Sequence, residues 1–413
     1  MMFGIYASKI KFTRAHARIL RKQNLTETEP GSIVHDFNAL LDYVQRRRLR
    51  VTSGQHQLSL SSLAEINARL QYPLELGLKR PQQKSYPPIH GLYLLLRASG
   101  LTYLDECRAT PHLEVDEELV NEWESLNPAE RYGTLLEVWL LRGHAEIVGE
   151  RARPYQRLPV NYESWVNFFG RMAKGEVAES DLDYLIYTPG WHNLGLLDLF
   201  GLIEIERGIP TAGKGWQIAR IRRTRFGEAL LAALFKACFS SSDWLTSITA
   251  GDIIPAGTLQ SVLQPYFPTW QRTLSLPTEP GFRAEIHIVK VTLWQDVWRR
   301  LALPGNLTLD GMAGAILDAY EFYHDHLYAF QYETRQGTQQ WIKHPFMEEE
   351  PTTADVFVGD LPLHVGQTMT FLFDFGDRWE FSVTLEAVEP PNKKSDYPRV
   401  LDAHGEAPEQ YRR

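Results

Sequence analysis

The chain has 413 residues, of which 44% are hydrophobic and 23% charged. These values exclude a small module, a disordered chain and a fibre, and they predict about two to four domains. Cys107 and Cys238 have no CxxC partner, so the sequence provides neither a disulfide framework nor a cysteine-based zinc site, and a cytoplasmic location fits best. Arg97 and Lys236 interrupt the longest apolar runs, so we expect a soluble protein without a membrane span.

Charge is distributed unevenly along the chain. From Gly281 to Arg413 there are 12 Lys+Arg and 21 Asp+Glu, a net charge of −9; because the whole chain carries −8, residues 1–280 carry +1. Positive charge in this first part gathers in the N-terminal 25 residues, at Arg46–Arg50 and over Lys214–Arg225. An acidic C-terminal part is a poor nucleic-acid surface, whereas the local basic patches suit one.

The domain organisation follows from these patterns and from one proline-rich stretch. Four prolines fall within Gln264–Gly281, which is typical of a connector between domains. We therefore predict a basic tail over 1–30, a helical domain over 31–150, a winged-helix-like helical domain over 151–263, a linker over 264–281 and an α+β domain over 282–413. The overall fold class is α+β, mostly helical at first and then built on an antiparallel sheet.

The N-terminal part has apolar residues at helical spacing over 37–44, 63–70, 92–96 and 132–140. The clearest helix start is Asn127-Pro128-Ala129-Glu130, because Asn can cap, Pro suits the first helical position and Glu can reach back to the cap. Seven tryptophans precede residue 281, and we interpret them as core residues, as at Trp123, Trp139 and Trp165.

Between Trp191 and Phe239 the pattern predicts helix, strand, loop, strand and helix, which is the order of a winged helix. The strings Leu199–Glu204 and Arg223–Leu231 resemble the C-terminal half of winged-helix regulators. The resemblance implies that the wing and the preceding helix meet DNA. Five basic residues are then candidates to neutralise phosphates: Lys214, Arg220, Arg222, Arg223 and Arg225.

The same residues also have a structural interpretation. If Ile203 and Ile205 face the core, Glu204 and Glu206 face outwards, where Arg220 and Arg222 would form cross-strand ion pairs with them. Winged helices also serve as packing units, so the resemblance alone does not establish DNA binding. The run Arg46–Arg50 is similarly typical of a solvated face at a helix end.

A partial P-loop pattern lies in the same segment. Gly208–Lys214 matches the first seven positions, but Gly215 stands where a Ser or Thr hydroxyl must hold magnesium. A P-loop joins a strand to a helix, whereas this loop is predicted to join two strands. We interpret its glycines as turn residues and expect no nucleotide and no other cofactor.

The C-terminal part alternates strands with one clear helix. Alternation predicts strands over Ala284–Leu293, Thr368–Phe375 and Phe381–Val388, and period 3.6 predicts an amphipathic helix over Thr308–Tyr323. Phe373–Phe381 reads as a tight turn between two strands.

These residues resemble the plasmid pRiA4b ORF-3-like family, also described as resembling the passenger protein of an insertion element. The resemblance covers about residues 282–411 and implies an α+β fold, links to mobile elements and a bacterial source, but no established activity. It rests on several motifs in order, which include Tyr397-Pro398 and the residues Trp298, Arg299, Arg300, His326, Tyr328, Asp374, Gly376, Asp377 and Trp379.

The sequence departs from the family pattern at two places. Many relatives carry His after the turn tryptophan where this chain has Glu380, and the closing Pro-Pro-Glu-Asp string is reduced to Ala407–Gln410. A metal site remains an alternative, since His and carboxylates suit divalent ions; its ligands would be His324, His326, Asp374 and Asp377. Asp and Gly in such a turn otherwise serve Asx-turn geometry, with Trp379 packing beneath.

Two functional hypotheses remain. The favoured one is a non-enzymatic binding or regulatory protein that contacts DNA or a protein partner, but no membrane, and carries the acidic domain as an interaction module. The alternative is a metal-dependent hydrolase or nuclease that uses the four His and Asp residues. The sequence contains no GxSxG or HExxH motif and no Rossmann fingerprint after a strand.

Overall fold

The computed structural model describes residues 11–52, 56–105, 110–142, 168, 189–240, 254–277, 281–294, 296–334, 339–347, 349–390 and 396–411. The chain divides into two compact units. The N-terminal unit comprises mainly Met1–Tyr103 and Glu114–Pro277, and the C-terminal unit mainly Thr278–Arg413 with Leu104–Leu113. The fold class is α+β, as predicted. Within the described residues, no helix is long and apolar enough to cross a bilayer.

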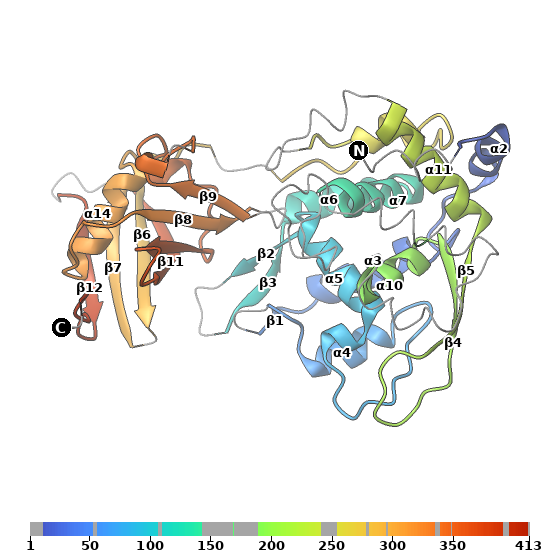
Figure 1. Ribbon diagram of the computed structural model, residues 1–413, viewed down its shortest axis with the longest axis horizontal. Coiled ribbons are helices and arrows are strands. Elements are labelled where there is room, and N and C mark those ends of the chain that lie inside the picture. Colours follow the sequence, from blue (N-terminus) through green and yellow to red (C-terminus); the bar gives the residue numbers. More distant parts are fainter. Residues whose placement is uncertain are drawn as a thin grey trace. The chain divides into compact units, whose positions relative to one another are not determined.

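The N-terminal unit is mostly helical (Figure 1). Its helices are α2 (Arg14–Lys22), α3 (Ile33–Gln45), α4 (Leu60–Asn67), η1 (Gln83–Ser85), α5 (Pro87–Ala98), α6 (Glu117–Ser125), α7 (Pro128–Glu137), η2 (Val138–Arg142), α10 (Trp191–Leu199), α11 (Arg225–Ser240) and α13 (Thr258–Leu263). One small sheet has the order β1-β3-β2, built from β1 (Leu49–Arg50), β2 (Thr102–Asp105) and β3 (His112–Val115). A separate hairpin pairs β4 (Ile203–Arg207) with β5 (Ile218–Arg223).

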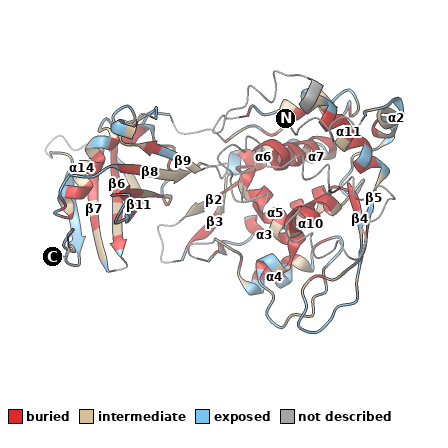
Figure 2. Ribbon diagram, viewed as in Figure 1, coloured by how far each residue is buried: buried red, intermediate tan, exposed pale blue. Residues whose placement is uncertain are grey.

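The core of this unit lies between α3, α5, α7 and α10, whose buried faces are red in Figure 2. Helix α7 begins with the predicted capping box. Asn127 Oδ1 accepts hydrogen bonds from the amides of Ala129 and Glu130, and the Asn127 amide donates to Glu130 Oε2. Trp123 and Trp139 are buried, as expected, whereas Trp165 and Cys107 lie outside the described residues.

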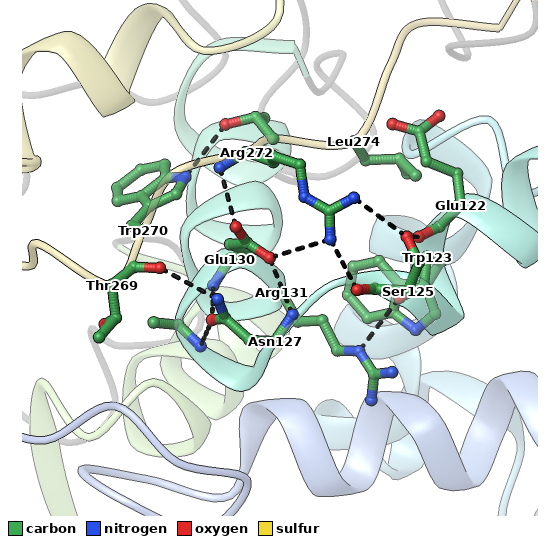
Figure 3. Close-up of polar contacts among 12 residues, drawn as sticks. Glu122, Trp123, Ser125, Asn127, Glu130, Arg131, Thr269, Trp270, Arg272 and Leu274 are labelled. Atoms are coloured by element: carbon green, nitrogen blue, oxygen red, sulfur yellow. Dashed lines mark hydrogen bonds and ion pairs between the residues drawn. The ribbon is translucent and has the colours of Figure 1, made fainter.

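The proline-rich stretch predicted as a linker is packed where it is described, over residues 264–277. Trp270 and Leu274 are buried, and Figure 3 shows the polar contacts that hold this stretch to α6 and α7. Arg272 donates through its amide to Glu130 Oε1 over 3.0 Å, and Asn127 Nδ2 donates to the Thr269 carbonyl over 3.0 Å. The prolines therefore shape an extended segment whose side chains and backbone pair with the helices of the N-terminal unit.

The segment predicted as a basic tail also contains ordered structure. Helix α2 is capped by Thr13, whose hydroxyl accepts from the His16 amide. The ring of Phe12 meets Tyr266 edge-on at 5.5 Å between centroids, and the Lys236 ammonium lies 5.5 Å from the Phe12 centroid. Aromatic and cation–π contacts thus attach this basic stretch to α11 and to residue 266.

The C-terminal unit is a seven-stranded sheet with the order β12-β7-β6-β11-β10-β8-β9. All its strand pairs are antiparallel. The strands are β6 (Ile286–Trp294), β7 (Val297–Pro304), β8 (Tyr328–Glu333), β9 (Gln339–Lys343), β10 (Thr368–Phe373), β11 (Trp379–Glu389) and β12 (Arg399–His404). Two 3-10 turns, η4 (Pro345–Met347) and η5 (Val358–Asp360), follow β9.

Helix α14 (Leu309–Ala319) lies on one face of this sheet and closes the main core (Figure 1). Met312, Ile316 and Leu317 pack there with Phe371, Phe373, Phe381 and other apolar strand residues. Thr308 caps the helix by accepting a hydrogen bond from the Gly311 amide over 3.1 Å. The three predicted strands, which are β6, β10 and β11, and the predicted helix are confirmed with small shifts of their ends, while β7, β8 and the two edge strands β9 and β12 were not predicted.

Candidate functional site

The predicted order of elements between Trp191 and Phe239 is present as α10, β4, β5 and α11. The hairpin register pairs Glu204 with Arg222 and Glu206 with Arg220. Ile203 on β4 and Ile221 on β5 are buried. The charged residues that alternate with them, Glu204, Glu206, Arg220 and Arg222, are exposed to solvent. This is the alternation that the sequence predicts for a strand with one face on the core.

Two polar side chains attach the hairpin to its flanking helices. Thr224 Oγ1 accepts from the Gly227 amide at the start of α11 over 2.8 Å and donates to the Gly201 carbonyl over 2.7 Å. Asp198, near the end of α10, accepts from the Ile205 amide over 3.1 Å. Burial raises the pKa of Asp198 to about 7, against the opposing effect of that hydrogen bond. The hairpin is therefore fixed to both helices at its base.

The five candidate DNA-binding residues divide into two groups. Three of them form ion pairs: Arg222 with Glu204 at 3.2 Å, Arg220 with Glu206 at 3.8 Å and Arg223 with Glu228 at 3.5 Å. These pairs are largely exposed, so each contributes little to stability. Lys214, in the loop, and Arg225, at the start of α11, are exposed, and neither has an ion pair within the described residues.

The loop with the partial P-loop pattern joins β4 to β5, as predicted. Gly208 donates its amide to the Gln217 carbonyl over 2.9 Å and so continues the hairpin. Gly213 has a φ of 76°, which favours glycine, and its amide donates to the Gly77 carbonyl over 2.8 Å. A loop between two antiparallel strands has no helix N-terminus for phosphates, so the glycines serve as turn residues.

Three arginines of the basic run Arg46–Arg50, which follows α3, pair with carboxylates. Arg46 lies 2.7 Å from Asp42, Arg47 lies 2.8 Å from Glu65, and Arg48 lies 2.5 Å from Glu114. This arrangement fits the interpretation of the run as a solvated, ion-paired face.

The four candidate metal ligands are only partly brought together. His324 and His326 do not alternate on a strand, because both precede β8. His324 Nε2 lies 3.0 Å from Asp318, whereas His326 Nε2 lies 3.5 Å from Asp374 Oδ2. Within the described residues, no group of three or more His, Cys, Asp or Glu is arranged to hold a metal ion.

Asp374 has the expected Asx-turn geometry. Its backbone has a φ of 55°, and Oδ1 accepts from the amides of Gly376 and Asp377 over 2.8 Å and 3.4 Å. Beneath this turn, the ring of Trp379 packs edge-on against Phe322 at 4.9 Å. Glu380, the residue after this tryptophan, is exposed and pairs with Arg378 at 2.7 Å.

Residues close to the C-terminus complete a polar cluster that the sequence did not predict. The Tyr411 hydroxyl donates to Asp325 over 2.5 Å and lies 2.9 Å from His326 Nε2. Gln410 Oε1 accepts a hydrogen bond from the Tyr323 amide over 2.6 Å, and Gln410 Nε2 donates one to Asp325 Oδ1 over 3.1 Å. The bond from Tyr411 holds the pKa of Asp325 below its ordinary value and raises the pKa of Tyr411 to about 12.

These contacts occur in a domain whose sequence motifs are family-specific. Residues 282–410 match the family model of the plasmid pRiA4b ORF-3-like protein. The resemblance drawn from the sequence is therefore confirmed for the C-terminal third of the chain. The match does not extend to the α10–α11 segment, and the family is uncharacterised.

The other comparisons add little. No curated protein matches the chain. A solved structure, a protein of unknown function (MM3350) from Methanosarcina mazei Go1, is similar at 22% identity, over 30% of this chain and 71% of that chain, with a TM-score of 0.27.

In the plasmid pRiA4b ORF-3-like domain, the motif arginines have structural partners. Arg299 is buried in β7 and donates to the carbonyls of Ala319, Trp298 and His404 over 2.9 to 3.0 Å. Its guanidinium also lies 4.8 Å from the ring centroid of Tyr320. Arg299 thus connects α14, β7 and β12.

Trp298 and Arg300, on either side of Arg299 in the sequence, lie on the opposite face of β7. Arg300 pairs with Glu386 at 2.6 Å and with Asp402 at 3.3 Å. Trp298 stacks on His404 at 5.8 Å, with the Lys290 ammonium 4.8 Å from its ring centroid. Tyr328 donates a hydrogen bond to Asp310 on α14. These motif residues are accounted for by packing within the domain.

Proposed function

We propose that this plasmid pRiA4b ORF-3-like protein is a non-enzymatic binding or regulatory protein that contacts DNA through the hairpin β4–β5 and the start of α11. The observation that carries the proposal is a pair of exposed cations, Lys214 and Arg225, that form no ion pair with any residue the structure describes and lie on either side of three ion-paired arginines. The element order of this segment, which resembles a winged helix, supports the same conclusion as an analogy of fold.

Electrostatics favour this segment over the rest of the chain. Residues 1–280 carry a net charge of +1, and residues 281–413 carry −9. A phosphate backbone is repelled by the second part and attracted to exposed cations of the first. Each phosphate that a cation neutralises releases counterions, so the affinity must fall as salt rises.

Fluorescence anisotropy of a labelled duplex with the full-length protein, measured across a salt series, tests the proposal. The double variant Lys214→Ala/Arg225→Ala should bind more weakly and reduce the slope of log K against log salt by about 1.8, since each phosphate contact contributes about 0.9. The matched control is Arg378→Ala/Arg399→Ala, which removes two exposed cations from the other unit.

The control should leave the slope unchanged. Absence of duplex binding at low salt, or equal effects of the two double variants, contradicts the DNA contact and points instead to a protein partner for the hairpin. A duplex series of unrelated sequences then separates base readout from phosphate contact, because phosphate contacts carry no sequence information.

A further inference from the structure

Large apolar side chains are exposed at one end of the C-terminal sheet. Four segments meet there: the β6–β7 turn, the loop before β8, the β10–β11 turn and the residues that follow β12. We call this surface the acidic–aromatic face, and its exposed apolar members are Trp294 (51% exposed), Tyr323 (68%), Leu327 (39%), Phe375 (42%) and Tyr411 (42%).

Direct contacts join these segments into one surface. The rings of Tyr323 and Tyr411 stack at 6.3 Å, and Trp294 lies 6.3 Å from Trp379. The carbonyl of Leu327 accepts a hydrogen bond from the amide of Asp374 over 3.0 Å, which places Leu327 beside the turn that carries Phe375. Exposed apolar side chains gathered in this way typically mark an interaction site.

Most of the charged residues of the face are acidic. Residues 318–327, 374–380 and 405–411 together contain eight carboxylates and one arginine. That arginine, Arg378, is already paired with Glu380 at 2.7 Å. Asp325 and Asp318 are 47% and 76% exposed, and Asp377 is also exposed. Among the described residues of the face, carboxylates therefore outnumber arginines, and the imidazoles of His324 and His326 lie 3.0 to 3.9 Å from Asp318, Asp325 and Asp374.

We propose that the acidic–aromatic face binds a basic polypeptide segment. Guanidinium and ammonium groups are attracted both to carboxylates and to the faces of aromatic rings, so such a segment uses both components of the surface. A phosphate-bearing partner would be repelled by the same charges. An uncharged apolar partner would bury carboxylates without compensation, at a large desolvation cost.

The face is also held in place before any partner arrives. Asp325 is fixed by Tyr411 and Gln410, and the Tyr323 amide is fixed by Gln410. The Asp374 side chain fixes the turn that presents Phe375 and Asp377. Side chains and loops ordered in advance lose less entropy on binding, which favours affinity. The inference goes beyond the proposed DNA contact, which uses the other unit.

The test uses full-length protein and a fluorescein-labelled deca-arginine peptide, with a deca-glutamate peptide as the control probe. The double variant Tyr323→Ala/Phe375→Ala leaves the net charge unchanged and keeps the Tyr323 amide bond. It should weaken deca-arginine binding about tenfold, because two cation–π contacts are lost. Phe346→Ala removes an 82% exposed ring from the loop after β9 and should leave the affinity unchanged.

A second pair of variants tests the charge. Asp377→Asn should weaken binding about threefold, whereas Glu389→Gln, an exposed acid at the opposite end of β11, should not change it. No binding of deca-arginine at low salt overturns the inference. Equal affinities of the wild type and the aromatic double variant also overturn it, since they would show only general attraction to an acidic protein. Duplex binding by the hairpin is measured separately and is independent of this result.

Discussion

The hydroxyl of Tyr411 donates a 2.5 Å hydrogen bond to Oδ2 of Asp325, across 86 positions of sequence. This bond attaches the last described residue of the chain to the loop before β8. It also lies at the centre of the cluster that contains His326 and Gln410. The C-terminal residues thus form part of the domain surface.

This bond predicts a pH dependence at both ends of the scale. The pKa of Tyr411 is raised to about 12 by Asp325, so the stabilisation is complete below the ordinary tyrosine pKa of about 10 and is lost as the pH rises through about 12. The pKa of Asp325 is lowered, so its share is present above the ordinary aspartate pKa of about 3.9 and is lost in stronger acid.

Ultraviolet difference titration of the wild type against Tyr411→Phe measures the upper transition. The difference should show one tyrosine that ionises near 12. A difference centred near 10 would contradict the hydrogen bond.

Gly133 on α7 packs so closely against Trp270 that a larger side chain should clash with it. A Cβ at this position would lie 2.3 to 2.5 Å from ring atoms of Trp270. Because Trp270 is buried and cannot withdraw, Gly133→Ala should lower the free energy of unfolding by about 1–3 kcal/mol. Chemical denaturation followed by tryptophan fluorescence measures it. The control is Gly215→Ala, since a Cβ there meets nothing within 4 Å; similar losses in both variants would contradict the close packing of the 264–277 stretch.

Arg299 and Arg300 are adjacent residues in different environments, so replacing each with lysine should change the free energy of unfolding by different amounts. Arg299 is buried and donates to carbonyls of α14, β7 and the residues at the end of β12. Lysine cannot reproduce this planar set of donors, so Arg299→Lys should cost about 2 kcal/mol in unfolding free energy. Arg300→Lys retains a partly exposed ion pair with Glu386 and should cost less than about 1 kcal/mol. Thermal and chemical unfolding of both variants measures the difference, and equal losses would contradict the buried role of Arg299.

The spacing of apolar residues predicted the strands and helices in which buried and exposed side chains alternate regularly. The outward position of Glu204 and Glu206, with arginines of β5 across from them, followed from the alternation of apolar and charged residues, whereas the exact register came from the structure. Strand β12 could not be predicted in this way, because all six of its residues are exposed and no periodicity distinguishes them from a loop. The packing of the stretch 264–277 could not be predicted for a related reason. Its prolines exclude regular structure, but its burial depends on Trp270 and on helices far away in sequence.

The candidate site was predictable only in part. The Asx turn at Asp374 follows from residue type, as does the hairpin that joins β4 to β5. The placement of His324 and His326 required the position of the loop before β8, which tertiary contacts decide. No signal in the sequence connects Tyr411 to Asp325, because a hydrogen bond across 86 positions has no local pattern.

The two hairpin glutamates, Glu204 and Glu206, form ion pairs with Arg222 and Arg220. If the hairpin contacts DNA, Glu204→Gln/Glu206→Gln should remove both ion pairs, so that the arginines no longer hold a carboxylate in place of a phosphate. The affinity for a duplex should then rise, and the slope of log K against log salt should steepen by up to about 1.8. Anisotropy across the salt series measures both quantities.

Glu65→Gln/Glu114→Gln makes the same change in net charge and removes instead the ion pairs of Arg47 and Arg48 near the end of α3. If this control steepens the slope as much as the hairpin variant, net charge rather than the hairpin sets the affinity. If only the hairpin variant does so, Glu204 and Glu206 moderate DNA binding by occupying the arginines that the phosphates require, and the cross-strand pairs serve both the structure and the contact.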